Sequence, residues 1–429
     1  MSIDRPETVM VHLSQSELNE IIRKHEVYLK GQNGGARAII KFKNLSGLNF
    51  HGKDMSHSDF TGSCFIGANL SRGTYTSATF FACDMRRANL ENANFVRADF
   101  RGAFVAGANL TGADLKSADL REGKIMQGRD KREREDRDGM SRTVFTGARM
   151  LKTNLSAVRA ANADFADADL SNVTIQGADL KGANLEGANL SHSDMTGVDL
   201  RNANLRNSIM EKTILDMVEK AGADFEGAIT EKAIGSSVFE LDKPLDELLK
   251  DHADWVTTGG AEGHKLDLSG FDLREAGPLN GYSLTALQAI GANFLNQNFS
   301  NVDMQSAVLN DSDFRDCNFA NSDIRGSSFK NARLTRCNFS EANLSPLMFK
   351  MGDQKRIQPV NMISASMRYS NFKNSKLAGV RFTNADLSFS DFTGADMRKA
   401  DLTGAKIDGA VFANAITDGM MIDPNVVLI

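Results

Sequence analysis

A repeat of five residues constrains the fold of this chain more than any other feature of its sequence. From Leu45 to Ile125, every residue whose number is divisible by five is apolar, which gives 17 apolar positions in succession. Since 41% of the chain is apolar, chance would produce that run with a probability on the order of 10⁻⁷. We call these large apolar residues repeat centres. The residue two positions before each centre is almost always small, and Asp or Asn often stands between the two.

Neither the helical period of about 3.6 residues nor the strand period of two can sustain such a pattern. A period of five instead predicts a coil with flat sides and tight corners, in which each repeat centre and its small neighbour point inward. The other three residues of each repeat then face water. One coil cannot bury its apolar side chains alone, so coils must stack through backbone hydrogen bonds. The sequence therefore predicts an all-β solenoid.

The repeats resemble those of the pentapeptide-repeat proteins, whose motif is A-(D/N)-L-x-x; Ala108-Asn109-Leu110 is one example. The resemblance extends roughly over residues 44–229 and 266–416. It implies a right-handed quadrilateral β-helix, in which four pentapeptides build one coil of about 20 residues. It implies little about function, because members of this family have many different roles.

The repeat resumes after each interruption of its pattern. Further repeat centres run from Phe145 to Leu205, from Phe294 to Phe349 and from Met362 to Phe412. Between the first two of these runs, four apolar residues have the spacing of a short helix that would end at Gly222. They are Met210, Ile214, Met217 and Val218.

A helix is predicted before each long series of repeats. Residues 18–29 and 245–256 both carry apolar side chains at i, i+3, i+4, i+10 and i+11 and a histidine at i+7, the spacing of one helix face. Ser14-x-x-Glu follows the capping-box pattern at the start of the first helix. We expect each helix to cover the exposed edge of a first coil. His25 and His252 are expected to lie partly buried on these helices rather than to act as catalysts or ligands.

The two halves of the chain read as a duplication. Residues 44–50 match residues 267–273, and both series of repeats then break into a polar loop after the same number of repeats. We therefore predict two tandem right-handed quadrilateral β-helices, each preceded by a capping α-helix. The expected organisation is an N-terminal arm and capping helix (1–43), a first β-helix (44–229) with a charged loop (126–143), a junction and second capping helix (230–265), a second β-helix (266–419) with a loop (350–361), and an apolar C-terminal tail (420–429).

Carboxylates are frequent, but their position argues against a catalytic or metal site. Nearly all stand just before a repeat centre, where Asp or Asn stabilises the corner through local backbone hydrogen bonds. Examples are Asp99, Asp114, Asp119, Asp179 and Asp199. With coils of about 20 residues, Asp59, Asp99 and Asp119 would share a face as a modest acidic column. No P-loop, dinucleotide-binding or paired metal motif is present, so we predict no catalytic, cofactor-binding or metal-binding residue and no cofactor.

Four cysteines are too few for a secreted disulfide framework, which favours a reducing compartment. Cys83, Cys317 and Cys337 occupy the small inward position, whereas Cys64 faces outward and is the candidate for an exposed thiol. Cys317 and Cys337 are 20 residues apart, so we expect them to stack as free thiols. No stretch approaches 18 apolar residues and no leader pattern opens the chain, which favours the cytoplasm over export or a membrane.

Two loops interrupt the repeats. Residues 129–138 of the first loop carry five charges of each sign, and the second loop, 350–361, is mildly basic. Because both follow the same number of repeats, we expect them to emerge at the same height in each β-helix. They are interpreted either as insertions that a solenoid tolerates or as contact points for partners.

A rigid rod without a catalytic constellation favours a non-enzymatic protein-interaction scaffold of the bacterial cytoplasm, with unknown protein partners. One alternative follows from the resemblance, since some family members mimic DNA and act on DNA gyrase. The net charges of −1 for residues 1–240 and −4 for residues 241–429 are weak for such a mimic. Another alternative, an enzyme-like junction supported by the β-helices, has only residues 206–265 for its chemistry. We expect no direct nucleic-acid binding and no membrane partner. The tail, 420–429, would cover the last coil or pair two copies as a homodimer.

Overall fold

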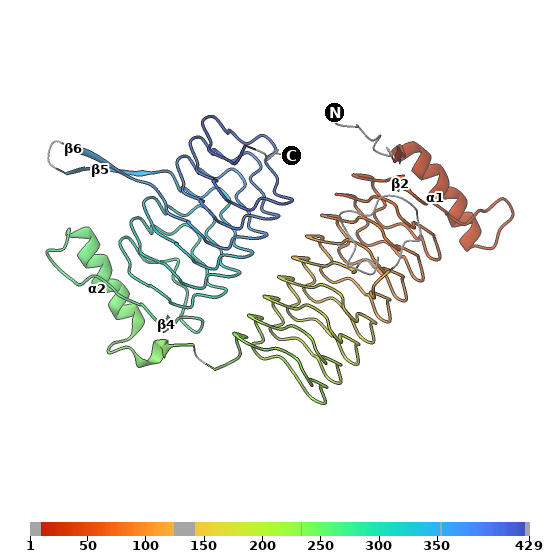
Figure 1. The fold of residues 1–429 in the computed structure, drawn as a ribbon, viewed down its shortest axis with the longest axis horizontal. Coiled ribbons are helices and arrows are strands. Elements are labelled where there is room, and N and C mark those ends of the chain that lie inside the picture. The colour runs from red at the N-terminus through yellow and green to blue at the C-terminus, as the bar shows by residue number, and fades with distance from the viewer. Residues whose placement is uncertain (1–9, 124–141, 233, 352–353, 425–429) are drawn as a thin grey trace. The chain divides into compact units, whose positions relative to one another are not determined.

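The structure is a computed structural model that describes residues 10–123, 142–232, 234–351 and 354–424 of the 429-residue chain (Figure 1). The chain divides into two compact units, Met1–Glu231 and Lys232–Ile429, called unit 1 and unit 2 below. Each unit has a hydrophobic core of its own. The boundary between them lies inside the segment that was predicted to join the two β-helices.

In both units the chain winds into stacked coils. Isolated parallel bridges join Asp59 to Thr79, Thr79 to Asp99 and Asp99 to Asp119, so the partner of each residue lies 20 positions further on. Backbone hydrogen bonds connect neighbouring coils at each side, as between Phe80 N and Asp99 O at 2.7 Å. An offset of 20 residues means four five-residue repeats per coil. The β-helical solenoid predicted from the repeat is therefore confirmed.

The repeat centres and their small neighbours fill the interior of the coils. Side chains one coil apart adopt the same orientation, so that aromatic rings stack in columns inside each unit. Phe80 and Phe100 stack at 5.1 Å between ring centroids in unit 1, and Phe319 and Phe339 at 4.8 Å in unit 2. Burying one such side chain contributes about 1.5–3 kcal/mol. Leu402, near the end of unit 2, is also a core residue and is 1% exposed.

Tight turns at the corners explain the polar residues of the repeat. The N–H of each small residue donates to the carbonyl of the preceding repeat centre, as Ala98 N does to Phe95 O at 2.9 Å. The residue before the small one adopts a left-handed backbone, with φ of 65° at Gly107 and 54° at Asn92. Gly and Asn tolerate this conformation best, which accounts for their frequency at this position.

Helix α1 (Gln15–Leu29) closes the first coil of unit 1 (Figure 1). It begins with the predicted capping box, in which the Ser14 side chain accepts from Glu17 N and the Glu17 carboxylate accepts from Ser14 N. Leu18 and Ile22 are buried in the core of unit 1. Strand β1 (Val11–His12) precedes the helix and pairs in parallel with β2 (Lys43–Asn44). The edge of the first coil is therefore covered by both a strand and a helix.

Helix α2 (Leu245–Thr257) has the same place in unit 2. It starts directly after Pro244, without a side-chain cap, and Leu249 inserts into the core of unit 2. Strand β3 (Ser236–Ser237) and a 3₁₀ turn, η1 (Val238–Glu240), precede it. Strand β3 pairs in parallel with β4 (Phe271–Asp272). Both units thus begin with a strand, a helix and a second strand that pairs with the first.

The contacts of the two helices show that the predicted sequence alignment of the two halves is shifted by one five-residue repeat. In unit 1, His25 Nδ1 accepts a hydrogen bond from Ala38 N at 3.1 Å; in unit 2, His252 Nδ1 accepts one from Leu266 N at 3.0 Å. Ala38 therefore corresponds to Leu266. The strand pairs agree, because 43–44 of β2 then correspond to 271–272 of β4.

This registration changes the correspondence of the repeat centres. Ile40, not Leu45, corresponds to Leu268, so residues 44–50 are equivalent to 272 and those that follow it rather than to 267–273. Neighbouring repeats are so similar in sequence that a short matching segment does not distinguish one repeat from the next.

The two interruptions consequently leave the coils at neighbouring corners. In unit 1 the last repeat centre before the interruption is Leu120, and Phe104 pairs with Val144 instead of with a residue 20 positions on. Residues 126–141 of the predicted loop lie outside the described residues. In unit 2 the last centre is Leu344, which lies one repeat closer to the cap. We expected both interruptions to begin at the same number of repeats from the capping helix. This is wrong by one repeat, which is one side of a coil.

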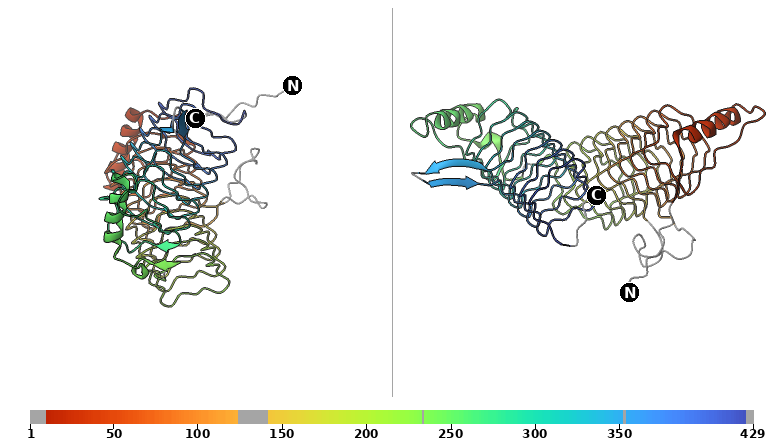
Figure 2. Two further views of the ribbon diagram at one scale, coloured as in Figure 1. Left: turned by 90° about the vertical axis from the view of Figure 1, so that its left-hand side faces the viewer. Right: turned by 90° about the horizontal axis from the view of Figure 1, so that it is seen from above.

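The interruption of unit 2 is a β-hairpin and not an irregular polar loop. Strand β5 (Leu347–Met351) pairs antiparallel with β6 (Gln354–Gln358) and the pair extends away from the coils of its unit (Figure 2). Phe349 was predicted to be a repeat centre, but it lies in β5 and is 40% exposed. Leu347, Phe349 and Met351 also alternate with the period of a strand, so the five-residue count could not distinguish the two structures.

The short helix predicted after Met210 does not form. Asp194 pairs with Ile214 and Asn204 with Asp224, so this segment builds the last coil of unit 1. Its backbone finds hydrogen-bond partners in the coil beneath it, which outweighs the helical spacing of a few apolar residues. Met217 remains 81% exposed as a result.

The repeat also continues beyond Phe412, where it was predicted to stop. Asp401 pairs with Met421, and Leu402 N donates to Met421 O at 2.8 Å. Met420 and Ile422 pack against the core of unit 2. The beginning of the predicted tail therefore belongs to the last coil, and residues 425–429 lie outside the described residues.

Candidate functional site

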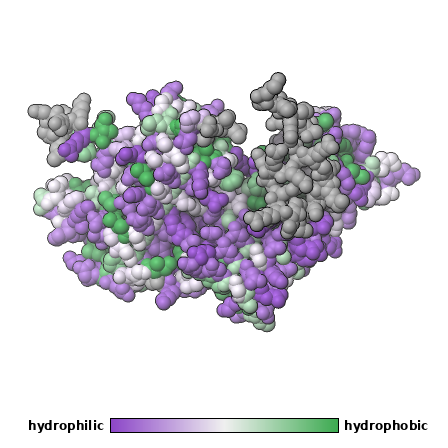
Figure 3. Space-filling view, in the orientation of Figure 1, coloured by the Kyte–Doolittle hydropathy of each residue, from purple (hydrophilic) through white to green (hydrophobic). Residues whose placement is uncertain are grey.

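The charged and polar side chains of this protein lie mainly on the outer faces of the coils. Within the described ranges, no three His, Cys, Asp or Glu side chains are arranged to hold a metal ion. No helix in the described part of the chain is long and apolar enough to cross a membrane. The visible surface is largely hydrophilic (Figure 3).

Aspartates before the repeat centres bind their own backbone, as predicted. Asp99 Oδ1 accepts from Arg101 N at 3.1 Å, which stabilises the corner. The same carboxylate also accepts from Arg101 Nε at 2.9 Å and from Nη2 at 2.8 Å. Asp and Arg separated by one repeat centre thus form a bidentate pair on the same face. The same arrangement recurs at Asp84–Arg86, Asp119–Arg121, Asp199–Arg201, Asp272–Arg274, Asp313–Arg315, Asp323–Arg325 and Asp396–Arg398.

The acidic column predicted in unit 1 exists but is not purely acidic. Asp59, Asp99 and Asp119 do lie on one face, since each is bridged to the next through the coils between them. Thr79 stands between the first two, and Arg159 follows Asp119 in the same column. The face therefore carries rows of mixed charge rather than a continuous negative stripe.

Three arginines converge on Asp119 in this column. Its Oδ2 lies 2.9 Å from Arg121 Nη2, 2.7 Å from Arg159 Nη2 and 3.8 Å from Arg101 Nε. The Asp119 side chain is only 9% exposed, whereas the three arginine side chains are 40 to 55% exposed. One carboxylate thus fixes the positions of three guanidinium groups at the surface.

The charges of this group stabilise one another. Burial raises the pKa of Asp119, but the hydrogen bonds from Arg121 and the charge of Arg159 outweigh it and bring this pKa below its ordinary value. The carboxylate in turn raises the pKa of Arg121, and Asp99 does the same for the pKa of Arg101. These shifts favour the ionised forms of Asp119, Arg121 and Arg101.

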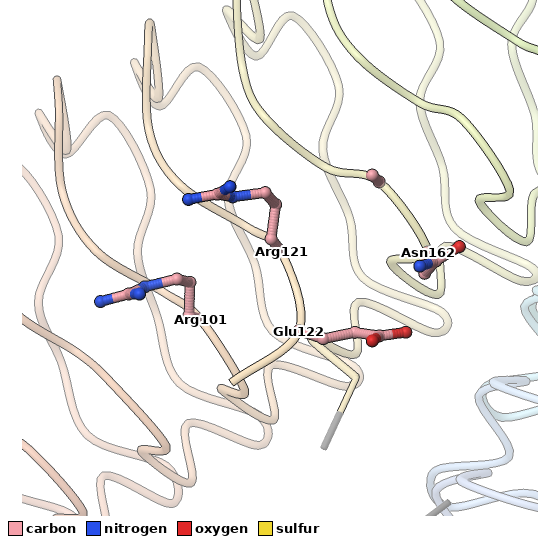
Figure 4. A pocket seen from close by; sticks show the side chains of 5 residues that line it. Arg101, Arg121, Glu122 and Asn162 are labelled. Carbon is pink, nitrogen blue, oxygen red and sulfur yellow. The ribbon is translucent and has the colours of Figure 1, made fainter. Parts of the chain in front are cut away.

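Hollows adjoin these arginines where neighbouring coils carry small residues. One, of about 290 Å³, is lined by Arg101, Arg121, Glu122, Ala161 and Asn162. Figure 4 shows Arg101 and Arg121 extending in the same direction from successive coils, while Glu122 points the other way. A second hollow, of about 690 Å³, lies over Ala157 and Ser117 and is flanked by Arg97 and Arg159.

This cluster of arginines was not predicted from the sequence. The Asp-x-Arg spacing at 99–101 and 119–121 was a readable signal, because one residue between them places both side chains on the same face. The part played by Arg159 could not be read in this way, since it lies 40 positions after Asp119 and meets it only across the interruption.

The two predicted histidines are structural. His25 and His252 are fully buried and accept a backbone N–H at Nδ1, so the proton of each neutral ring is on Nε2. Burial lowers the pKa of both imidazoles. Each ring also stacks on an aromatic residue of its own helix, Tyr28 and Trp255 respectively. They attach the helices to the first coils.

The cysteines occupy the predicted positions. Cys83, Cys317 and Cys337 are buried free thiols, and Cys64 is partly exposed. Cys317 and Cys337 lie one coil apart, since Asn338 N donates to Cys317 O at 3.0 Å. Burial raises the pKa of both thiols, as expected of inert core residues.

The comparisons with known proteins agree with the repeat. The family model described as Pentapeptide repeats matches residues 44–73, 83–124, 140–177, 175–212, 283–316, 312–345 and 365–404, which together make up more than half of the chain. The chain therefore belongs to the pentapeptide-repeat family. No curated protein matches it in sequence.

Solved structures similar to the chain include other pentapeptide-repeat proteins. QnrB1, a plasmid-mediated fluoroquinolone resistance protein, is 21% identical over 46% of this chain and 86% of its own, with a TM-score of 0.20. Rfr23 from the cyanobacterium Cyanothece 51142 is 26% identical over 29% of this chain and 90% of its own, with a TM-score of 0.20. HetL from Nostoc sp. strain PCC 7120 is 15% identical over 92% and 96%, with a TM-score of 0.13. With TM-scores this low, membership rests on the repeats and not on these superpositions.

Proposed function

We propose that the protein is a non-enzymatic scaffold of the bacterial cytoplasm that binds partner proteins through its β-helix faces and the two interruptions. The observation that supports this proposal is the fixed order of the charged side chains. Pairs such as Asp99–Arg101 and Asp199–Arg201 are locked to their own backbone, and Asp99–Arg101 and Asp119–Arg121 stand in successive coils, about 4.8 Å apart. A partner would meet a preformed surface, with little side-chain entropy left to lose on binding.

We also propose that the chain is not an enzyme, because the junction between the two units leaves little room for a catalytic domain. The junction was the one place predicted to have room for chemistry, but residues 211–229 complete the last coil of unit 1. Helix α2 covers the first coil of unit 2 through Leu249 and His252. What remains of the junction has too few residues for an independent catalytic domain. Placement in the cytoplasm rests on the scarcity of cysteine.

We further propose that both units are copies of one module, a capping helix followed by a right-handed quadrilateral β-helix. The equivalent histidine contacts at Ala38 and Leu266 support this duplication, as do the equivalent pairs β1–β2 and β3–β4. Independent folding of residues 1–231 and 232–429 as separate chains would test it.

The scaffold proposal is tested by capture with the immobilised full chain. We expect one protein to be retained at about 0.15 M ionic strength, where surface charge pairs are screened beyond about 8 Å, and to be identified by mass spectrometry. An unrelated solenoid of similar net charge is the control. A chain that retains nothing beyond this control would contradict the proposal.

A regulator that mimics DNA and acts on gyrase remains a second candidate. The mixed face of unit 1 counts against it, because Arg101, Arg121 and Arg159 interrupt the carboxylates that would imitate phosphates. A supercoiling assay with purified gyrase decides the question. Protection or inhibition at micromolar protein would establish this candidate, and no effect would remove it.

We also propose that two copies pair through the last coil of unit 2. Ile416 and Met421 are about half exposed there, on an edge that no further coil covers among the residues up to 424. Light scattering should then give a dimer mass, reduced to that of a monomer by deletion of residues 420–429. A monomer mass for the full chain would remove this proposal.

A further inference from the structure

The arginines around Asp119 form a local excess of positive charge. Arg97, Arg101, Arg121 and Arg159 line the two hollows, together with the carboxylates of Asp99, Asp119 and Glu122. We call these four arginines the arginine cluster. Asp119 is nearly buried beneath them, while the arginines remain exposed. A ligand that approaches this face therefore meets the guanidinium groups first.

Three of the four guanidinium groups, those of Arg101, Arg121 and Arg159, are held in place before any ligand arrives. Arg101 binds Asp99 through two hydrogen bonds and lies 5.4 Å from the ring centroid of Phe81. Arg121 and Arg159 both bind Asp119. A fixed guanidinium loses little rotamer entropy when it binds an anion. Small residues at Ala157 and Ala161 leave room beside them for such a group.

The surroundings limit the size of the anion. Along the same column, Asp59 precedes the cluster, and Asp179 and Asp199 follow it. Nucleic-acid backbones need a continuous basic stripe, and here their phosphates would meet carboxylates on both sides. A short segment with a few carboxylates fits the positive area without reaching its negative neighbours.

We propose that the arginine cluster of unit 1 binds a short acidic segment of a partner protein, with the partner's carboxylates in the hollows over Ala157 and Ala161. The proposal rests on the scaffold function proposed above and names the chemistry of its partner. Carboxylates accept bidentate hydrogen bonds from arginine, which gives geometric selectivity as well as attraction.

The test measures binding of a fluorescein-labelled hexaglutamate peptide to the full chain by fluorescence anisotropy. It is made at about 0.01 M ionic strength, where the Debye length is about 30 Å. The variant Arg101→Gln with Arg121→Gln should weaken binding about tenfold. The matched control, Arg201→Gln with Arg398→Gln, removes the same charge from two Asp-x-Arg pairs outside the cluster and should bind like the wild type.

A second variant guards against loss of the fold. Arg159→Gln leaves every Asp-x-Arg pair intact and should still weaken peptide binding about threefold, with unchanged circular dichroism. Equal weakening by the control pair, or no binding to the wild type, would overturn the proposal. It would also be overturned by equal competition from oligothymidine or from inorganic phosphate at matched ionic strength. Tighter binding after residues 127–141 are replaced by a Gly/Ser linker would assign the cluster to the chain's own segment and likewise overturn it.

The peptide measurement and the capture experiment fail independently. If the full chain captures a partner and the Arg101→Gln, Arg121→Gln variant captures the same partner equally well, the scaffold stands and the proposal for the cluster fails. If the peptide binds the cluster as expected but no protein is captured, the scaffold function fails instead.

Discussion

In unit 1 the chain leaves the coils after Leu120 and rejoins them at Thr143, whereas in unit 2 it leaves after Leu344 and returns through a hairpin before Met362. The coils on either side of each interruption nevertheless stack as if nothing had been inserted. Ring stacking even continues across the hairpin, from Phe339 to Phe372 at 4.9 Å. The two units thus have interiors of the same kind and differ at the corners where the chain leaves the coils.

The difference shows which positions of the repeat are constrained. An inward residue must fit between two neighbours one coil above and below, so its size is limited. A corner residue faces water, and a longer connection costs little when its ends remain close. The outer faces are free to differ for the same reason, and only unit 1 has the arginine cluster among the described residues. The following predictions test this division.

The largest effect is expected for the interior. Leu402→Ala should cost about 2–5 kcal/mol of unfolding free energy, measured by urea denaturation. Leu185→Ala, in the middle of unit 1 with coils on both sides, should fall at the upper end of that range. Arg398→Ala and Lys399→Ala should each cost below about 0.5 kcal/mol. Equal small effects at all four positions would show that the assigned register is wrong.

The next prediction concerns the histidines that attach the two capping helices, and how the stability of each unit depends on pH. Because burial lowers the pKa of His25 and His252, the stability due to their neutral forms is complete above the unfolded pKa of about 6.5. It is lost as the pH falls from there through the folded pKa. Both units should therefore lose stability as the pH falls below about 6.5.

Substitution of both histidines separates this effect from general acid sensitivity. The double variant His25→Gln, His252→Gln keeps a side-chain acceptor for the backbone N–H groups and should flatten the pH dependence at a cost of about 1 kcal/mol per site. Thermal unfolding at several pH values measures it. An unchanged slope would contradict the assignment of these two residues.

A third prediction compares two aspartates on one face of unit 1. Asp119→Asn should cost about 1–3 kcal/mol, because it leaves three arginines without their shared carboxylate. Asp199→Asn, which affects one exposed pair, should cost below about 1 kcal/mol. The pKa of both carboxyl groups is lowered, so their contribution is complete above pH ~3.9 and is lost as the pH falls through the folded pKa. Equal costs in urea denaturation would contradict the convergence on Asp119.

The smallest effect is expected at the corners. Replacement of residues 127–141 with a short Gly/Ser linker should change the unfolding free energy by less than about 0.5 kcal/mol, since the coils on both sides stay connected. The matching replacement of residues 351–359 in unit 2 should do the same. If partner capture survives both changes, the interruptions are passive and recognition lies on the faces.

Local features were predictable from the sequence because each repeat carries its own instruction. The inward position of Cys317, the burial of Leu402 and the backbone contact of Asp99 follow from a residue's place within five. The capping box at Ser14 is equally local. Features that depend on more than one repeat were harder to predict from the sequence. Phe349 is an example, because an apolar residue in a hairpin strand can have the same spacing as a repeat centre.

The sequence by itself determined the coil, its interior and the helices that cover the first coils, since the order of large, small and polar residues settles which side chains can be buried. The tertiary structure decided which coils become neighbours. Arg159 meets Asp119 because the coil that follows Leu120 in space begins at Thr143, so that Asp119 pairs with a residue 40 positions further on. The contacts of His25 and His252 likewise decided which residues of the two units correspond, which short similar sequence segments did not. The physical reason is that backbone hydrogen bonds join whichever coils are adjacent in space, and a five-residue pattern does not record how many residues separate them.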